Sequence, residues 1–248
     1  MAAIPPPDGA SPDGSRTTVR ASDLYGPDLP HEVEAPTGSH LGPIHCTPPE
    51  PDRNTMTANA TDPTDDRGLP RVVDEYGSIL EVFDLPCDEN TLLAVLTELF
   101  ENWWDDIFFG TLVQGGAWEV AAPNAPERIS MLDGYVTVDF GRWHFHLCIG
   151  EHTASGPELG RIRTCSQAFL YRSLLQDGSP VSWGLRMLNG EGTQIGSVLL
   201  PNPFLSNRQD ILLEPDWTRL ACWDLLRRRF LGLDPDPKDR TGTGFAHG

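Results

Sequence analysis

The chain has 248 residues and a formal charge of −18, with 36 acidic residues against 18 basic ones. This charge argues against a nucleic-acid-binding protein, because phosphate contacts require a basic surface. No segment has the run of about 20 apolar residues that spans a membrane, and prolines occupy the positions where a signal peptide has its apolar centre. We therefore expect a cytoplasmic protein that binds neither nucleic acid nor membrane. Its five cysteines, an odd number without a C-x-x-C pair, should be reduced thiols.

The first 70 residues differ in composition from the rest of the chain. They hold 13 of the 23 prolines and a single aromatic residue, Tyr25. Such a segment cannot bury enough apolar surface to offset the conformational entropy lost on ordering. We predict that residues 1–70 form a disordered, proline-rich acidic tail and that residues 71–248 form a single domain. Met56 offers an alternative start of translation, which would leave residues 1–55 untranslated.

Apolar residues at helical spacing predict three helices in the domain. Asp88 can cap the first, in which leucines recur every three or four residues. Pro157 suits the first position of the second helix, in which four apolar side chains share one stripe. Cys165 and Cys222 lie on or beside apolar stripes, so we expect buried, unreactive thiols there. The helices are expected over residues 88–110, 157–176 and 216–231.

Short apolar or alternating runs predict strands, several of them joined by hairpins. The clearest hairpin has its turn at Asn189-Gly190-Glu191-Gly192, between two alternating runs. Consecutive hairpins with few crossovers imply an antiparallel sheet. The expected fold class is α+β, with about three helices packed on one side of that sheet. The strands are expected at 78–83, 110–114, 117–121, 129–132, 135–140, 143–149, 181–187 and 195–200.

The stretch Trp143-His-Phe-His-Leu-Cys148 alternates apolar and polar residues. Gly141-Arg142 precedes it as a two-residue loop, typical of a type II′ hairpin. This turn sets a register in which Asp139 faces His144. One face of the hairpin is then wholly apolar and should pack on the core. The other face carries Tyr135, Thr137, Asp139, His144, His146 and Cys148.

This polar face predicts a metal site. Imidazoles two residues apart on a strand project side by side and can both reach one ion, while a carboxylate supplies charge. Two histidines and a carboxylate suit iron or zinc as the divalent metal. The alternative is a solvent-facing strand pair in which Asp139 merely pairs with His144. The candidate metal ligands are His144, His146, Asp139, Glu151, Cys148 and His152, and Tyr135 or Arg186 could assist a cofactor, including a haem bound through either strand histidine.

The pattern His144-x-His146-x-x-x-x-Glu151 resembles the first metal motif of the cupin family, a β-barrel superfamily of metal-dependent oxygenases, isomerases and binding proteins. The resemblance covers eight residues. Val138 stands where that motif has a glycine, and the histidine of the second cupin motif has no counterpart in a later strand. The resemblance therefore implies a ligand set and not a fold.

Three longer motifs resemble a family of uncharacterised bacterial proteins, and this resemblance spans most of the domain. It implies no known activity, so function must be inferred from the site residues. The motifs are Trp143-His-Phe-His-Leu-Cys-Ile-Gly150, Val181-Ser-Trp-Gly-Leu-Arg186 and Leu200-Pro-Asn-Pro-Phe-Leu205.

Two classes of function fit these observations. The first is a metal-dependent protein, such as an iron or zinc enzyme that performs redox or oxygen chemistry on a small molecule. The second is a non-catalytic accessory module for a protein partner, or a haem-binding protein. Arg227-Arg228-Arg229 could clamp an anion, although basic residues in the last turn of a helix usually complement its dipole. The sequence contains no glycine-rich phosphate loop, no Ser-His-Asp order and no G-x-S-x-G elbow.

Overall fold

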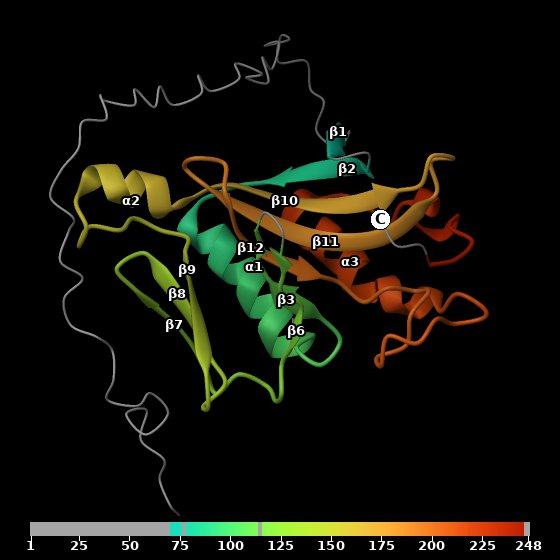
Figure 1. The fold of residues 1–248 in the computed structure, drawn as a ribbon, viewed down its shortest axis with the longest axis horizontal. Helices are drawn as coiled ribbons and strands as arrows, with labels where there is room; N and C mark the ends of the chain where they lie inside the picture. Colours follow the sequence, from blue (N-terminus) through green and yellow to red (C-terminus); the bar gives the residue numbers. More distant parts are fainter. Residues whose placement is uncertain (1–69, 76–77, 114–115, 246–248) are drawn as a thin grey trace, which may run out of the picture. The chain divides into compact units, whose positions relative to one another are not determined.

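The computed structural model describes residues 70–75, 78–113 and 116–245 (Figure 1). The predicted tail and Met56 lie outside the described residues, apart from Pro70. The described part has antiparallel sheets and three α-helices, which confirms the α+β class. None of its helices is long and apolar enough to cross a membrane.

The largest sheet has seven antiparallel strands in the order β1-β2-β10-β11-β12-β3-β6. The hairpin of β10 and β11 forms its centre, and β2 and β12 flank this hairpin. These strands are β1 (Arg71–Glu75), β2 (Ser78–Leu85), β3 (Phe108–Gly110), β6 (Val120–Ala121), β10 (Cys165–Leu174), β11 (Pro180–Asn189) and β12 (Gln194–Leu199).

A separate three-stranded sheet has the order β7-β8-β9 and contains the histidine-bearing hairpin. It consists of β7 (Arg128–Leu132), β8 (Tyr135–Asp139) and β9 (His144–Cys148). A short pair, β4 (Leu112–Val113) and β5 (Gly116–Ala117), lies between β3 and β6 in the chain.

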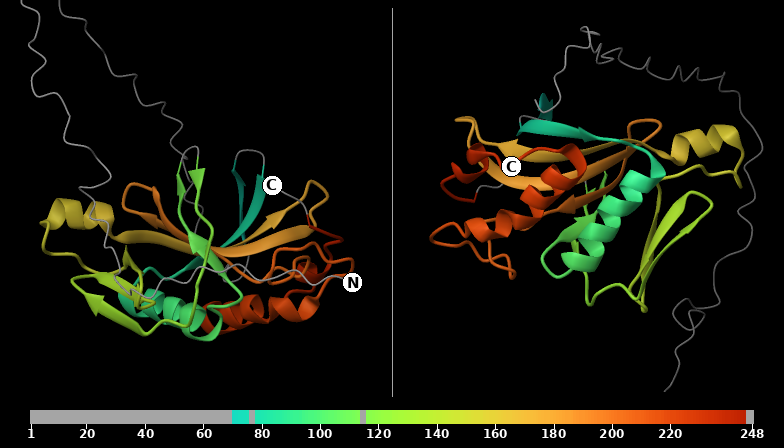
Figure 2. Two further views of the ribbon diagram at one scale, coloured as in Figure 1. Left: turned by 60° about the horizontal axis from the view of Figure 1, so that its bottom comes forward. Right: turned by 180° about the vertical axis from the view of Figure 1, so that it is seen from behind.

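The helices are α1 (Glu89–Asn102), α2 (Pro157–Arg163) and α3 (Ala221–Leu226). Helical turns at Trp217–Leu220 and Arg227–Leu231 extend α3 at both ends. Figure 2 shows α1 and α3 on the same face of the seven-stranded sheet, with the three-stranded sheet also on that side. Helix α2 lies beyond the end of the sheet rather than on its face, so two of the three helices cover it (Figure 1).

The main core lies between the seven-stranded sheet and these layers. Trp183 of β11 and Trp223 of α3 are almost fully buried in it, as are the leucines along the inner side of α1. A smaller cluster on the opposite face of the sheet contains Phe169 and Tyr171. The central strands are therefore buried on both faces near β10.

The local expectations for the first and third helices hold in part. Asp88 caps α1, and its carboxylate accepts a 2.9 Å hydrogen bond from the Thr91 amide. Helix α1 ends at Asn102, earlier than expected, because residues 108–110 pair with β12 as a strand. The predicted third helix is present from Trp217 to Leu231. It consists of three consecutive segments, a 3-10 turn, the α-helix α3 and a π-helical turn.

The second predicted helix is wrong beyond residue 163. Only Pro157–Arg163 is helical, and Cys165–Leu174 forms the central strand β10. Leu159 and Ile162, the first two members of the apolar stripe that indicated a helix, lie in α2. Cys165 and Phe169, the other two, belong to a central strand buried on both faces, in which every residue from Ala168 to Arg172 is buried. A continuous apolar run does not distinguish a buried strand from a helix by its periodicity.

Candidate functional site

The predicted register of the histidine hairpin is confirmed. Asp139 pairs with His144, Thr137 with His146 and Tyr135 with Cys148, with no slip between β8 and β9. The Phe140 amide donates to the Trp143 carbonyl at 3.0 Å and closes a two-residue loop. Gly141 has a φ of 83° in this loop, the positive value that the first position of a type II′ turn requires.

The apolar face of this hairpin is buried mainly through β8. Val136, Val138 and Phe140 have at most 1% exposure, as expected for core positions. Trp143, Phe145 and Leu147, on the β9 side, are only partly buried. The reason is that these three side chains form one wall of an apolar cavity.

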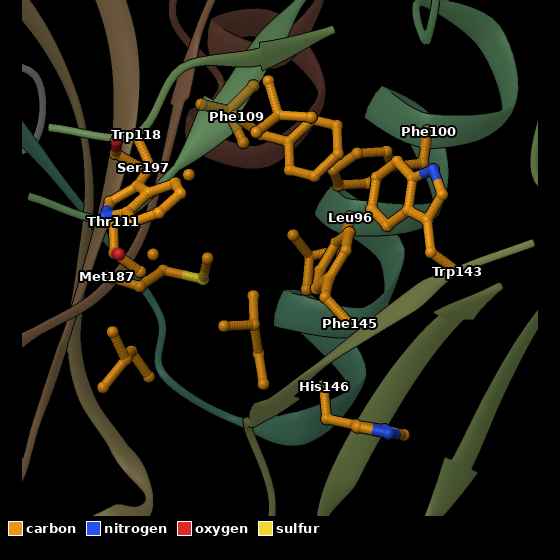
Figure 3. A pocket seen from close by; sticks show the side chains of 16 residues that line it. Leu96, Phe100, Phe109, Thr111, Trp118, Trp143, Phe145, His146, Met187 and Ser197 are labelled. Carbon is orange, nitrogen blue, oxygen red and sulfur yellow. The ribbon is translucent and has the colours of Figure 1, made fainter. Parts of the chain in front are cut away.

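This cavity, called the apolar pocket below, has a volume of about 260 Å³ and lies between the two sheets and α1. Figure 3 shows Trp118, Met187 and Ser197 on one side, and Phe145 and Trp143 on the other. The lining residues are Leu96, Phe100, Phe109, Gly110, Thr111, Trp118, Val120, Trp143, Phe145, His146, Leu147, Met187, Ile195, Gly196, Ser197 and Val198.

Aromatic rings in mutual contact build much of the pocket wall. The Phe109 ring lies 5.7 Å from that of Trp143 and 5.1 Å from that of Phe145, measured between centroids. Phe100, from α1, adds an edge-on contact to Phe109 at 5.0 Å. Such packing holds the wall in one arrangement, because offset and edge-to-face pairs are favourable beyond the area that they bury.

The imidazoles of His144 and His146 lie on the other face of the hairpin. Their ring centroids are 4.8 Å apart, and both residues are exposed. Figure 3 shows the His146 ring directed away from the pocket, as strand alternation requires. Thr137 Oγ1 lies 2.8 Å from His146 Nδ1, so a hydrogen bond orients this ring and leaves Nε2 for another partner.

The structure does not gather the other candidate metal ligands around this pair. Asp139 accepts a hydrogen bond from the Gly141 amide and pairs with Arg128 at 3.4 Å. Cys148 is buried beside Thr164, and Glu151 is exposed beyond the strand end. Across residues 70–75, 78–113 and 116–245, no three histidine, cysteine, aspartate or glutamate side chains come together in a group that could hold a metal ion.

His152 belongs to a separate cluster. Its Nδ1 lies 2.8 Å from a carboxylate oxygen of Asp133, and its Nε2 lies 2.8 Å from Ser155 Oγ. Sequence reasoning missed Asp133 and Ser155. The Asp133-Gly134 pair is a type I′ turn sequence between β7 and β8, and it was the available signal that this carboxylate sits at a tight, ordered turn.

The remaining candidates lie elsewhere. Tyr135 contacts the His152 ring edge-on at 5.0 Å, whereas Arg186 is on β11 with its guanidinium 5.1 Å from the centre of the Tyr171 ring. Each side chain of the Arg227–Arg229 run faces a carboxylate of this chain, namely Asp239, Asp234 and Glu98 in turn.

Two of the cysteines are buried as expected. Cys165 has 3% exposure and Cys222 has none. Burial raises the pKa of the Cys165 thiol to about 12 and raises that of Cys222 well above its ordinary value. Thiols with such pKa values stay protonated near neutral pH and are poor nucleophiles or metal ligands.

Comparisons with known proteins identify a family but no activity. The crystal structure of ChuX is similar with a TM-score of 0.39 and 13% identity, over 58% of this chain and 74% of the ChuX chain. No curated protein matches the sequence. Residues 70–232 match a family of unknown function, DUF7676, which agrees with the resemblance to uncharacterised proteins in the sequence motifs. This match covers most of the chain, and the protein therefore belongs to the DUF7676 family.

Proposed function

We propose that the domain binds a small, largely apolar molecule in the apolar pocket. The observation that carries this proposal is the lining itself. Five aromatic side chains, Phe100, Phe109, Trp118, Trp143 and Phe145, surround about 260 Å³, and no aspartate, glutamate, lysine or arginine is among the described lining residues. Ligand pockets in proteins are typically concave, apolar and aromatic, with few polar groups.

Exposed apolar surface around the pocket supports an occupant. Trp118 is 67% exposed and Val120 is 36% exposed, although both border a cavity that other apolar side chains line. Each Å² of apolar surface left in water costs roughly 25 cal/mol, so a ligand that covers these side chains recovers that free energy on binding.

The size and polarity of the pocket define the class of ligand. Its volume lies just below the range of about 300–1,000 Å³ that encloses drug-sized molecules. The ligand should therefore have one or two rings, or a short aliphatic chain. Thr111 and Ser197 bring hydroxyl groups to the lining and can orient a single polar substituent.

A neutral fluorescent probe with two fused rings, 6-propionyl-2-dimethylaminonaphthalene, tests this proposal. Gly196→Val serves as the pocket-filling variant, because Gly196 lines the pocket and a Cβ there meets the lining residues Met187 and Leu147 at 3.2–3.4 Å. Gly244→Val is the matched control, since a Cβ there meets nothing within 4 Å. We expect binding by the wild type and the control, and at least ~10-fold weaker binding by folded Gly196→Val. Equal affinity in all three proteins contradicts the proposal.

The His144 and His146 pair is a second candidate site, for a transition-metal ion or a haem iron. The orientation of His146 by Thr137 favours it, because ligating histidines usually have their second nitrogen hydrogen-bonded. Calorimetric titration with Zn²⁺, Fe²⁺ under reducing conditions, and haemin is the test. His144→Ala and His146→Ala should each abolish nearly all binding, and Thr137→Val should weaken it about 10-fold or more. Unchanged affinity in both histidine variants, or no binding by the wild type, leaves the pair as a solvent-facing strand surface.

A further inference from the structure

Asp133, His152 and Ser155 form a chain of hydrogen-bonded groups that the strand histidines do not share. The Asp133 carboxylate lies 2.8 Å from His152 Nδ1, and His152 Nε2 lies 2.8 Å from Ser155 Oγ. These are the contacts of an acid, a base and a nucleophile in acyl-transfer enzymes. In the amino-acid sequence the three residues occur in the order Asp, His, Ser. Sites of this kind occur with several sequence orders, and they are therefore recognised by their geometry and not by a sequence motif.

The fold holds Asp133 firmly in place. It occupies the tight β7–β8 turn with a φ of 46°, next to Gly134 with a φ of 78°. The Gly134 carbonyl accepts from the Ile149 and Gly150 amides, so the segment after β9 crosses the turn closely. A Cβ on Gly134 would lie only 2.5 Å from the Glu151 carbonyl oxygen. This close crossing places His152 beside the Asp133 carboxylate.

Hydrogen bonds from neighbouring groups also favour the ionised form of the Asp133 carboxylate. It accepts hydrogen bonds from the Thr153 amide, the Thr153 hydroxyl and the Ala154 amide at 2.8–3.2 Å. Chiefly through the Thr153 amide bond, these contacts lower the pKa of Asp133 to about 2. A carboxylate that remains charged can stabilise an imidazolium that forms on the neighbouring His152.

His152 has the burial and orientation that a base needs. The side chain is 7% exposed, and both an Asp133 carboxylate oxygen and the Asp133 carbonyl lie near Nδ1. Two acceptors at Nδ1 favour the tautomer with the proton on that nitrogen. The lone pair of Nε2 is then directed at the Ser155 hydroxyl.

Ser155 is accessible and has a cation beside it. Its residue is partly exposed, and Arg163 Nη1 donates to Oγ at 2.6 Å while lying 3.3 Å from His152 Nε2. A guanidinium at this position stabilises negative charge that develops on or next to Oγ. An open hollow of about 490 Å³ is lined by His152 and Thr153 but not by Ser155, so an ester reaches the partly exposed Ser155 from solvent.

We propose that Ser155 is a nucleophile for acyl transfer, that His152 is its base, and that Asp133 is the positioning residue. The substrate class is a small carboxylic ester. Ser155 Oγ forms a bond to the carbonyl carbon as its proton moves to His152 Nε2, and the carbonyl electron pair moves to oxygen. Collapse of this intermediate breaks the bond to the leaving alkoxide, which takes the proton from Nε2. Water then attacks the acyl-serine by the same route and releases the carboxylic acid.

Covalent labelling of the full-length protein tests the nucleophile directly. An alkyl fluorophosphonate forms a bond from an activated serine Oγ to phosphorus and expels fluoride. We expect one adduct by intact mass, and peptide mapping should place it on Ser155. Ser155→Ala should lose the adduct. Ser166→Ala should keep it, because the hydroxyl of the exposed Ser166 donates to the Asn189 carbonyl at 2.6 Å and not to an imidazole. No adduct on the wild type, or an adduct on another residue, overturns the proposal.

The roles of His152 and Asp133 are tested by the rate of ester hydrolysis and by its dependence on pH. With 4-nitrophenyl acetate as the probe ester, His152→Gln should reduce the rate by at least ~100-fold, the typical contribution of a general base. Asp133→Asn should reduce it near neutral pH, because an amide at Nδ1 favours the tautomer that turns Nε2–H toward Ser155. The rate of this variant should rise in alkaline solution, where hydroxide can take the serine proton in place of the imidazole. Thermal unfolding establishes that each variant is folded. A folded His152→Gln protein with the wild-type rate, or an Asp133→Asn protein with an unchanged pH profile, contradicts these roles.

Discussion

Asp239 places its carboxylate 2.9 Å from the guanidinium of Arg172, with 0% of the Asp239 side chain and 3% of the Arg172 side chain exposed. The same carboxylate accepts hydrogen bonds from the indoles of Trp183 and Trp223, both at 2.8 Å. One acidic group thus joins the helical turn Pro237–Arg240 to β10, β11 and α3. Arg172 also pairs with Glu81 of β2 at 2.5 Å and with Asp236 at 2.8 Å.

Removal of the Asp239 carboxylate should strongly destabilise the domain. In Asp239→Ala, the Arg172 charge and two indole N–H groups lose a buried partner, and breaking such a pair typically costs about 3–5 kcal/mol. The matched control is Asp234→Ala, whose side chain is 93% exposed and lies 3.7 Å from Arg228. That change should alter stability by no more than about 0.5 kcal/mol. Urea unfolding measures both, and similar losses in the two variants would contradict the role assigned to Asp239.

Two phenylalanines on the histidine hairpin should differ in their contribution to stability. Phe140 is 1% exposed within the core, so Phe140→Ala should cost about 3–5 kcal/mol. Phe145 is only partly buried and faces the apolar pocket, so Phe145→Ala should cost less and enlarge the pocket. The free energies of unfolding in urea provide the comparison. An equal or larger cost for Phe145→Ala would mean that the pocket is closed in solution.

Acid should weaken the hydrogen bonds that the Thr153 and Ala154 amides donate to the Asp133 carboxylate. The pKa of Asp133 is lowered from 3.8 to about 2 in the folded protein, first of all by the Thr153 amide. A lowered folded-state pKa means that the contribution is complete above the unfolded value and is lost as pH falls toward the folded value. Amide exchange at Thr153 and Ala154 should therefore quicken as pH falls from about 4 to 2, relative to the intrinsic rates. Asp133→Asn should lack this pH dependence, and protection that is independent of pH in the wild type would refute the assignment.

Deletion of residues 1–69 should leave the thermal stability of the domain nearly unchanged. This expectation rests on composition, because a proline-rich segment with one aromatic residue cannot supply a core of its own. Differential scanning calorimetry of the full chain and of residues 70–248 is the measurement. A large fall in melting temperature on truncation would demonstrate that part of the tail packs on the domain.

Rules that act over a few residues determined much of the β8–β9 hairpin from the sequence. A glycine in a two-residue loop and the alternation around it were sufficient to predict the pairing of Asp139 with His144. The cap at Asp88 followed in the same way, since its partner Thr91 is only three residues away. Turn and capping interactions depend on neighbours in the chain, so they can be read without the fold.

Other features depended on contacts between distant segments. β10 was predicted to be helical because its apolar stripe was compatible with either structure, and only its position between β2 and β11 decided the matter. The apolar pocket likewise required two sheets and α1 to meet, which no local pattern encodes.

The sequence by itself determined which side chains share each face of the histidine hairpin, but not what surrounds those faces. Cys148 follows the alternation of the polar face, yet it is buried where the chain turns toward α2, and His152 pairs with Asp133 from the β7–β8 turn. Strand alternation specifies a direction relative to the backbone. The burial of a side chain and its bonding partners depend on which other elements pack against that face of the strand. Only the tertiary structure decides this.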